Sequence, residues 1–147
     1  MQESYTLNVA GLTRQLPICP VNEHLSIAAF VMFGDVEITV ACAKELLARC
    51  PDFDYLLTGK PYLIARKGHK LYMQNPVEVA DQSITTVGQQ SLVVDRTELE
   101  ALTSKRILLV DDVISTGGSM QALESLAAHS RGVVVGKAAV LAEGDAA

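Results

Sequence analysis

Hydrophobic and polar positions alternate along this 147-residue chain in segments that predict both strands and helices. Residues 6–18 are expected to supply one or two strands. Asp35 is then typical of a helix N-cap, and Pro51 of a helix end. Between them, apolar side chains recur at helical spacing: Val36, Val40, Ala43, Leu46 and Leu47. The first third of the chain therefore predicts strands followed by a helix.

The last third of the chain predicts a strand, a loop, a helix and a strand. Residues 107–110 form a continuous apolar run, as expected of a buried parallel strand. A loop at 111–118 leads to a helix that Gly132 is expected to stop, and an apolar strand covers 133–141. The helix places its apolar residues on one face: Met120, Leu123, Leu126 and Ala127. This order is a βαβ unit, which implies an α/β fold with ligands at the carboxyl ends of parallel strands.

The middle of the chain is more polar. Residues 62–65 predict a short strand, and a polar stretch from Arg66 to about Gln90 follows it. Short strands are expected near 77–79 and 91–94, and residues 95–103 predict a capped helical turn.

Composition excludes several classes of protein. The net charge of −5 argues against duplex nucleic acid as a main partner, because neutralising phosphates requires clustered Lys and Arg. No apolar run approaches the roughly 20 residues that span a bilayer, and the first residues do not resemble a secretory signal. Cys19, Cys42 and Cys50 lack the spacing of a zinc site. We expect a cytoplasmic protein with reduced cysteines that binds neither nucleic acid nor membrane.

The segment RILLVDDVISTGGSMQAL carries the clearest chemistry. The strand ends in Asp111 and Asp112, whose carboxylates can accept hydrogen bonds from sugar hydroxyls or orient water on Mg²⁺. Gly117 and Gly118 allow the backbone to approach a phosphate, and the amides that open the helix can point at the anion. Three hydroxyl groups can add hydrogen bonds: those of Ser115, Thr116 and Ser119.

Two other interpretations fit part of this segment. A pair of acids at a strand end can be solvated turn residues, but the following STGGS favours a phosphate loop. A response-regulator receiver domain also opens with ILLVDD. Its phosphoacceptor lies well downstream, however, and Asp145 is the sole later aspartate here.

VDDVISTGGS resembles, residue by residue, the signature by which type I phosphoribosyltransferases bind 5-phosphoribosyl-1-pyrophosphate (PRPP). The resemblance implies a Rossmann-like α/β core, a central parallel sheet flanked by helices. By the same resemblance Asp111 and Asp112 hold the ribose hydroxyls and reach Mg²⁺ through water, and Ser115–Ser119 hold the 5-phosphate. Mg²⁺ is the implied cofactor.

The basic residues after 62–65 fit the same family. In the type I phosphoribosyltransferases, a basic pair directly after this strand contacts pyrophosphate. The resemblance therefore implies that Arg66 and Lys67 contact pyrophosphate, and that Lys70 is a further contact for PRPP. Positive charge there would stabilise the diphosphate as it leaves. The following polar stretch would form a lid, which Tyr72 could help to close, although a packing role for Tyr72 fits equally well. A solvated basic loop is the alternative.

Several sequence segments from the N-terminus onward, including AGLTRQLPI and ARKGHKLYM, resemble those of adenine phosphoribosyltransferase-like proteins of the purine branch. The resemblance implies one domain over 1–147, with a small N-terminal hood at about 1–33 and the core at about 34–147. In the hood, Phe30, Val31 and Phe33 are candidate contacts for the base, or packing residues. Ser115 stands where hypoxanthine–guanine enzymes carry an Asp, which disfavours a 6-oxopurine substrate.

One departure affects the expected activity. The family has a loop and a helix where only Gly59 and Lys60 here separate Thr58 from Pro61. Either the helix is absent, or residues have been lost from the sequence at this point, which we favour because both flanks resemble family strands. We expect a transferase that moves the 5-phosphoribosyl group of PRPP to a purine, with adenine favoured, in nucleotide salvage. By analogy with the family, we expect a homodimer. A non-catalytic PRPP-binding regulator of the same fold is the alternative.

Overall fold

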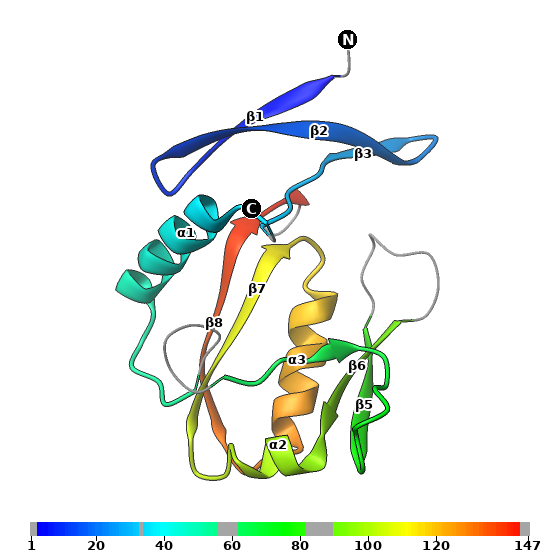
Figure 1. Ribbon diagram of the computed structural model, residues 1–147, viewed down its shortest axis with the longest axis vertical. Helices are drawn as coiled ribbons and strands as arrows, with labels where there is room; N and C mark the ends of the chain where they lie inside the picture. Colours follow the sequence, from blue (N-terminus) through cyan, green and yellow to red (C-terminus); the bar gives the residue numbers. More distant parts are fainter. Residues whose placement is uncertain (1–2, 33, 56–61, 82–89, 145–147) are drawn as a thin grey trace. The chain divides into compact units, whose positions relative to one another are not determined.

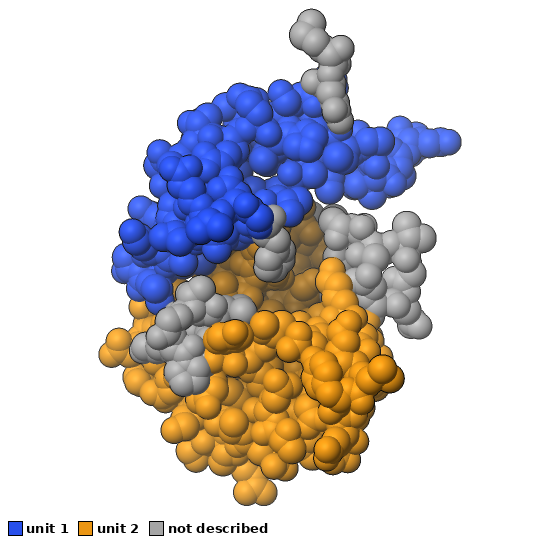
Figure 2. Space-filling model, in the orientation of Figure 1, with its two compact units in different colours: residues 1–49 blue, residues 50–147 orange. Residues whose placement is uncertain are grey.

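The computed structural model describes residues 3–32, 34–55, 62–81 and 90–144. The chain divides into two compact units, residues 1–49 and 50–147, which Figure 2 shows in blue and orange. Helices and strands are labelled in Figure 1. In the described part of the chain, no helix is long and apolar enough to cross a membrane.

The first unit contains an antiparallel sheet of order β1-β2-β3. The strands are β1 (Ser4–Val9), β2 (Leu12–Asn22) and β3 (Leu25–Ala28) (Figure 1). Ala10 and Gly11 make the tight turn between β1 and β2, both with positive φ (49° and 75°). This confirms the strands predicted within residues 6–18.

Helix α1 (Val36–Arg49) begins where the sequence predicts it. Asp35 Oδ1 accepts a hydrogen bond from the Ile38 amide at 3.0 Å, as an N-cap does. The side chains that α1 buries are Ile38 and Cys42. The predicted apolar face was partly wrong, because Val36 and Val40 are exposed.

Arg14 of β2 holds the sheet of the first unit to the start of α1. Its Nε lies 2.6 Å from Asp35 Oδ2 and its Nη2 lies 2.8 Å from Glu37 Oε2. The hydrogen bond from Arg14, ahead of the one from the Ile38 amide, lowers the pKa of Asp35 to about 2. The capping carboxylate therefore stays ionised at neutral pH, which suits the positive end of the helix dipole.

The second unit contains two sheets (Figure 1). An antiparallel sheet has the order β4-β6-β5, and β7 pairs with β8 in parallel. Tyr55 adds a parallel bridge to Ile107 on β7. The elements are β4 (Arg66–Lys67), β5 (Pro76–Asp81), β6 (Gln90–Asp95), α2 (Arg96–Glu100), β7 (Arg106–Ile114), α3 (Gly118–Ala128) and β8 (Val133–Ala142). The predicted βαβ unit is confirmed as β7-α3-β8.

Helix α3 packs against both sheets and closes the main core of the second unit. Met120, Leu126 and Ala127 of α3 meet Ile107 and Leu109 of β7 in this core. The antiparallel sheet and the segment after it complete the cluster with Val77, Leu92, Val94, Leu99 and Leu102. Burial of these apolar side chains fixes β7 and the start of α3 relative to each other.

Two predicted boundaries in this unit were wrong. Residues 62–65 form no strand: β4 begins only at Arg66, which pairs with Val93 of β6. In the register of β4 and β6, residues 62 and 63 would face α2, which begins at Arg96, so no strand lies opposite them. The loop predicted at 111–118 also starts later, because β7 continues to Ile114 alongside β8.

Asp95 is the buried polar residue that joins several elements of the second unit. Its Oδ1 caps α2 by accepting from the Thr97 amide at 3.0 Å, as the predicted capped turn requires. Its Oδ2 accepts from the Gln74 amide at 2.7 Å and from the Asn75 amide at 3.2 Å. Glu98 completes a capping box with it. One carboxylate thus fixes both α2 and the end of the loop that follows β4.

Replacing Asp95 by asparagine is expected to destabilise the chain most at neutral pH. Hydrogen bonds from the Thr97 side chain, the Thr97 amide and the Gln74 amide lower the pKa of Asp95 to about 2. Because the pKa is lower in the folded state, this stabilisation is present above about pH 4 and is lost as pH falls through about 2. The urea midpoints of the two proteins should converge at low pH. A midpoint difference that does not change with pH would contradict this role, and Asp52→Asn, an exposed carboxylate, is the control.

Candidate functional site

The candidate site is built on the strand–turn–helix formed by β7 and α3 (Figure 1). Residues 115–117 form the turn, and Gly117 is the N-cap of α3 with φ 81°. A Cβ at Gly117 would meet no atom within 4 Å, so the need for glycine there is conformational. The Gln121 amide donates to the Gly117 carbonyl at 2.9 Å, which leaves the amides before it to point out of the helix. This arrangement is suited to binding a phosphate.

Asp111 and Asp112 lie half-buried at the carboxyl end of β7. Asp111 Oδ1 accepts from the Asp112 amide at 3.0 Å, and Asp112 Oδ1 accepts from the Val113 amide at 2.8 Å. A carboxylate has two acceptor oxygens, which suit the binding of a hydroxyl or a hydrated cation. The structure therefore places the two acids near the end of β7, with two residues between Asp112 and the turn at 115–117.

Two carboxylates suit Mg²⁺, which shares its ligands with water and substrate, better than a metal ion that is bound by protein side chains alone. Within the described ranges, no three or more His, Cys, Asp or Glu side chains gather as a metal site. Mg²⁺ typically keeps several waters and is bound through one or two carboxylates together with substrate phosphates. Asp111 and Asp112 supply that kind of oxygen donor.

The basic residues lie on the other sheet of the same unit. Arg66 and Lys67 form β4, where Arg66 is half-buried and Lys67 is exposed. Lys70 lies in the exposed loop that Gly68 opens with φ 87°. Because α3 packs against both sheets, one compact unit carries the acids, the phosphate turn and the basic loop.

His69 and Glu78 form a contact that the sequence did not indicate. His69 Nε2 lies 2.7 Å from Glu78 Oε2. Hydrogen bonds from the Ser91 hydroxyl first, and then from His69, lower the pKa of Glu78. The contact ties the basic loop to β5. No local pattern could have shown it, since the two residues are nine positions apart on either side of a turn.

The predicted base contacts belong to the first unit. Phe30 is half-buried and Val31 is 65% exposed, while Phe33 lies outside the described residues. The interval between Thr58 and Pro61, where the family has a loop and a helix, also lies outside them. The roles of these residues therefore remain predictions from the resemblance.

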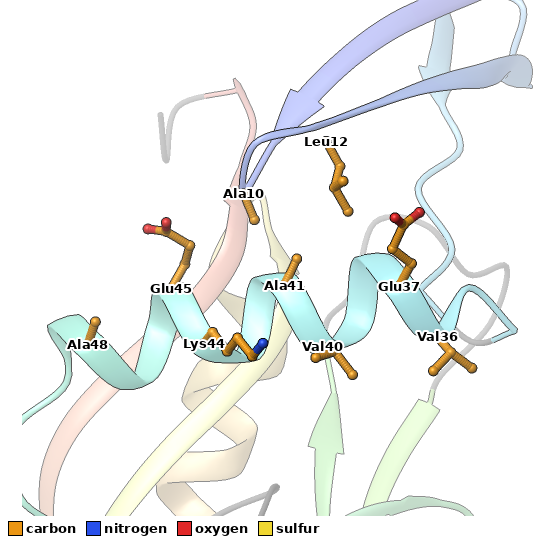
Figure 3. A pocket seen from close by; sticks show the side chains of 9 residues that line it. All are labelled: Ala10, Leu12, Val36, Glu37, Val40, Ala41, Lys44, Glu45 and Ala48. Atoms are coloured by element: carbon orange, nitrogen blue, oxygen red, sulfur yellow. The ribbon is translucent and has the colours of Figure 1, made fainter.

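A hollow of about 630 Å³ lies within the first unit, between α1 and the turn that joins β1 and β2 (Figure 3). Leu12 points toward the helix, and Ala41 faces the turn. Charged side chains of α1 share its lining: Glu37, Lys44 and Glu45. None of the predicted PRPP contacts lines it.

Sequence comparison identifies relatives that match part of the chain. No family model matches the chain. The chain is 32% identical over 114 residues to an adenine phosphoribosyltransferase of Mycoplasma capricolum, which covers 76% of this chain and 62% of that protein. It is also 32% identical over 78 residues to an adenine phosphoribosyltransferase of Ureaplasma parvum, covering 53% of this chain and 42% of that protein. These similarities support a type I phosphoribosyltransferase of the purine branch. The chain spans about half the length of these curated relatives.

Solved structures confirm the phosphoribosyltransferase fold. An adenine phosphoribosyltransferase of Saccharomyces cerevisiae, solved with adenine and an imino-altritol bisphosphate, superposes with a TM-score of 0.67 at 16% identity, over 87% of this chain and 84% of that chain. One from Rhodothermus marinus gives a TM-score of 0.66 at 20% identity, over 86% of this chain and 81% of that chain. At such low identity these structures establish the fold, as the VDDVISTGGS motif predicted.

Proposed function

We propose that this phosphoribosyltransferase transfers the 5-phosphoribosyl group of PRPP to adenine and releases pyrophosphate. In this reaction the bond from ribose C1 to the diphosphate oxygen breaks, and its electron pair leaves with pyrophosphate. A bond forms between C1 and a ring nitrogen of the base, and the proton of that nitrogen passes to the pyrophosphate or to water. The observation that carries the proposal is the turn at 115–117, which joins two acids on β7 to the open amide end of α3.

Each part of PRPP has a matching group in the second unit. Asp111 and Asp112 would hold the ribose hydroxyls and, with Mg²⁺ bound, its water ligands. The amides and hydroxyls of Ser115–Ser119 would hold the 5-phosphate. Arg66, Lys67 and Lys70 would bind the diphosphate, where their charge stabilises the leaving group. Mg²⁺ would neutralise charge on the diphosphate.

Adenine is favoured over other bases on two grounds. The relatives in Mycoplasma and Ureaplasma are adenine phosphoribosyltransferases, and the Saccharomyces structure contains adenine. Ser115 also replaces the acid expected in 6-oxopurine enzymes.

We further propose that Phe30, Val31 and Phe33 contact the base, that residues 1–33 form the hood of a single domain, and that the protein is a cytoplasmic homodimer.

The reaction is tested by measuring pyrophosphate release from Mg²⁺–PRPP with adenine, hypoxanthine, guanine, xanthine and orotate. We expect turnover with adenine and at least about tenfold less with the 6-oxopurines, because a site that lacks a required hydrogen-bond partner discriminates strongly. Turnover with a different base would correct the substrate. PRPP binding without turnover on any base would contradict the transferase and support a regulatory PRPP-binding protein.

A further inference from the structure

Arg66 has an incompletely satisfied guanidinium in the described structure. Its Nε is buried, and among the described residues it has no hydrogen-bond partner. The backbone of Arg66 is fixed by pairing with Val93, which is fully buried. A buried N–H without a partner is unfavourable, and turning the guanidinium toward an anion would relieve this cost. Arg66 is therefore placed to receive a negatively charged ligand.

The ring of Tyr72 stacks against this guanidinium. Arg66 Cζ lies 5.7 Å from the centroid of the Tyr72 ring, within the range of a cation–π contact. Tyr72 is 63% exposed, so core packing does not account for its position. Leu71 beside it is fully exposed. Of these two neighbours in the loop, Tyr72 is the one that contacts the basic site.

The loop that carries Tyr72 is fixed at both ends. At its start, the Gly68 amide donates to the Ser91 carbonyl at 3.3 Å. At its end, the Gln74 amide donates to Asp95 Oδ2 at 2.7 Å. Between them, the Met73 amide donates to the Lys70 carbonyl at 3.0 Å and closes a turn. These bonds hold the ring over Arg66.

We infer that Tyr72 is a positioning residue, whose ring orients the Arg66 guanidinium so that its N–H groups face the diphosphate of PRPP. The inference rests on the proposed function, because it assigns the diphosphate as the anion that Arg66 receives. The guanidinium is planar and binds phosphate oxygens through paired N–H groups, so the orientation of its plane decides how many it can reach. Stacking on an aromatic face sets that plane.

The inference is tested by calorimetric titration of the full chain with Mg²⁺–pyrophosphate and, separately, with Mg²⁺–PRPP. We expect Tyr72→Leu to weaken both by about 2- to 5-fold, the range of a cation–π contact at an exposed site. Tyr72→Phe should bind within about twofold of the unmodified chain, because it retains the ring. Leu71→Ala is the matched control from the same loop and should bind unchanged. Equal losses in the Leu and Phe variants would overturn a role for the ring.

A double-mutant cycle separates action through Arg66 from a direct contact. In an Arg66→Gln background, Tyr72→Leu should have no further effect on binding, because the partner of the ring is gone. A further loss of the same size would show that Tyr72 acts independently, and would overturn the inference. If the unmodified chain binds neither ligand, the proposed function itself fails. If Arg66→Gln weakens binding and Tyr72→Leu does not, the inference alone fails.

Discussion

Replacing Asp112 by asparagine is expected to lower kcat/KM for PRPP by about 10- to 100-fold, the loss of one charge-assisted hydrogen bond to the ribose. Asparagine has the same shape, and its side-chain oxygen can still accept from the Val113 amide, which Asp112 Oδ1 now does at 2.8 Å. What the variant loses is a second acceptor oxygen and the negative charge that the proposed function assigns to the hydrated Mg²⁺. Steady-state formation of the nucleotide at varied PRPP concentration measures the effect.

The control for this variant is Asp52→Asn, which removes an exposed carboxylate elsewhere in the second unit. Both variants change the net charge by the same amount, so a general electrostatic effect on PRPP would appear in both. We expect a change of less than about twofold in the control, as for most surface substitutions. A loss in Asp112→Asn no larger than in Asp52→Asn would contradict the assignment of Asp112 to the ribose.

Local signals in the sequence were sufficient to predict the strand–turn–helix that carries the candidate site. Asp111, Asp112 and Gly117 are neighbours in sequence, and their positions follow from a strand that ends shortly before the start of a helix. The N-caps Asp35 and Asp95 were also predictable, because a cap bonds to residues two or three positions away. Features that depend only on residues a few positions apart can thus be predicted without knowledge of the tertiary structure.

The errors concern residues whose surroundings depend on distant segments. Residues 62–65 have a composition suited to a strand but join no ladder, and in the register of β4 and β6 the first two of them would face α2 and not a strand. On α1, apolar spacing alone did not distinguish the buried Ile38 from the exposed Val36. Propensity and spacing fix which residues are apolar, whereas the neighbours that cover them come from tertiary packing.

The contacts that shape the basic loop were not predictable for the same reason. Asp95 reaches back about twenty residues to Gln74, and Tyr72 reaches Arg66 across a turn. In the sequence, the run from Arg66 to Lys70 favours a role in binding pyrophosphate, and a solvated basic loop is the alternative. The structure adds a buried Nε and a stacked ring, which give Arg66 an environment that the other basic residues of the loop do not share in the described part of the chain.

Substitution of Gly132 is expected to have the second large effect, which is a loss of stability. The sequence indicated that Gly132 ends a helix, but the structure gives a different reason for glycine at this position. It was predicted as the glycine that ends α3, but the helix ends at Ala128, and Gly132 does not have a positive φ. A Cβ on Gly132 would lie 2.6 Å from the Leu102 carbonyl oxygen and 2.5 Å from Ile107 Cδ1. Glycine is required there because the start of β8 passes close to the turn before β7.

Replacing Gly132 by alanine is expected to lower the free energy of unfolding by about 1 to 3 kcal/mol, the usual range for overpacking. The backbone cannot easily move away, because the Val133 amide donates to the Lys105 carbonyl at 2.8 Å and the Ser104 amide to the Arg131 carbonyl at 3.1 Å. For a chain of this size the melting temperature should fall by roughly 3 to 10 °C, as measured by thermal unfolding followed by circular dichroism.

Gly136→Ala is the matched comparison, because its added Cβ would meet side chains rather than backbone: Leu108 Cδ1 at 2.9 Å and Pro51 Cγ at 3.1 Å. The Leu108 side chain can rotate to relieve the contact, so the loss of stability should be smaller than for Gly132→Ala. If Gly136→Ala proves the more destabilising of the two, the close approach of β8 to the Leu102 carbonyl is not what requires glycine at 132. If neither variant shifts the midpoint by more than about 1 °C, the packing between β7 and β8 is looser than these distances indicate.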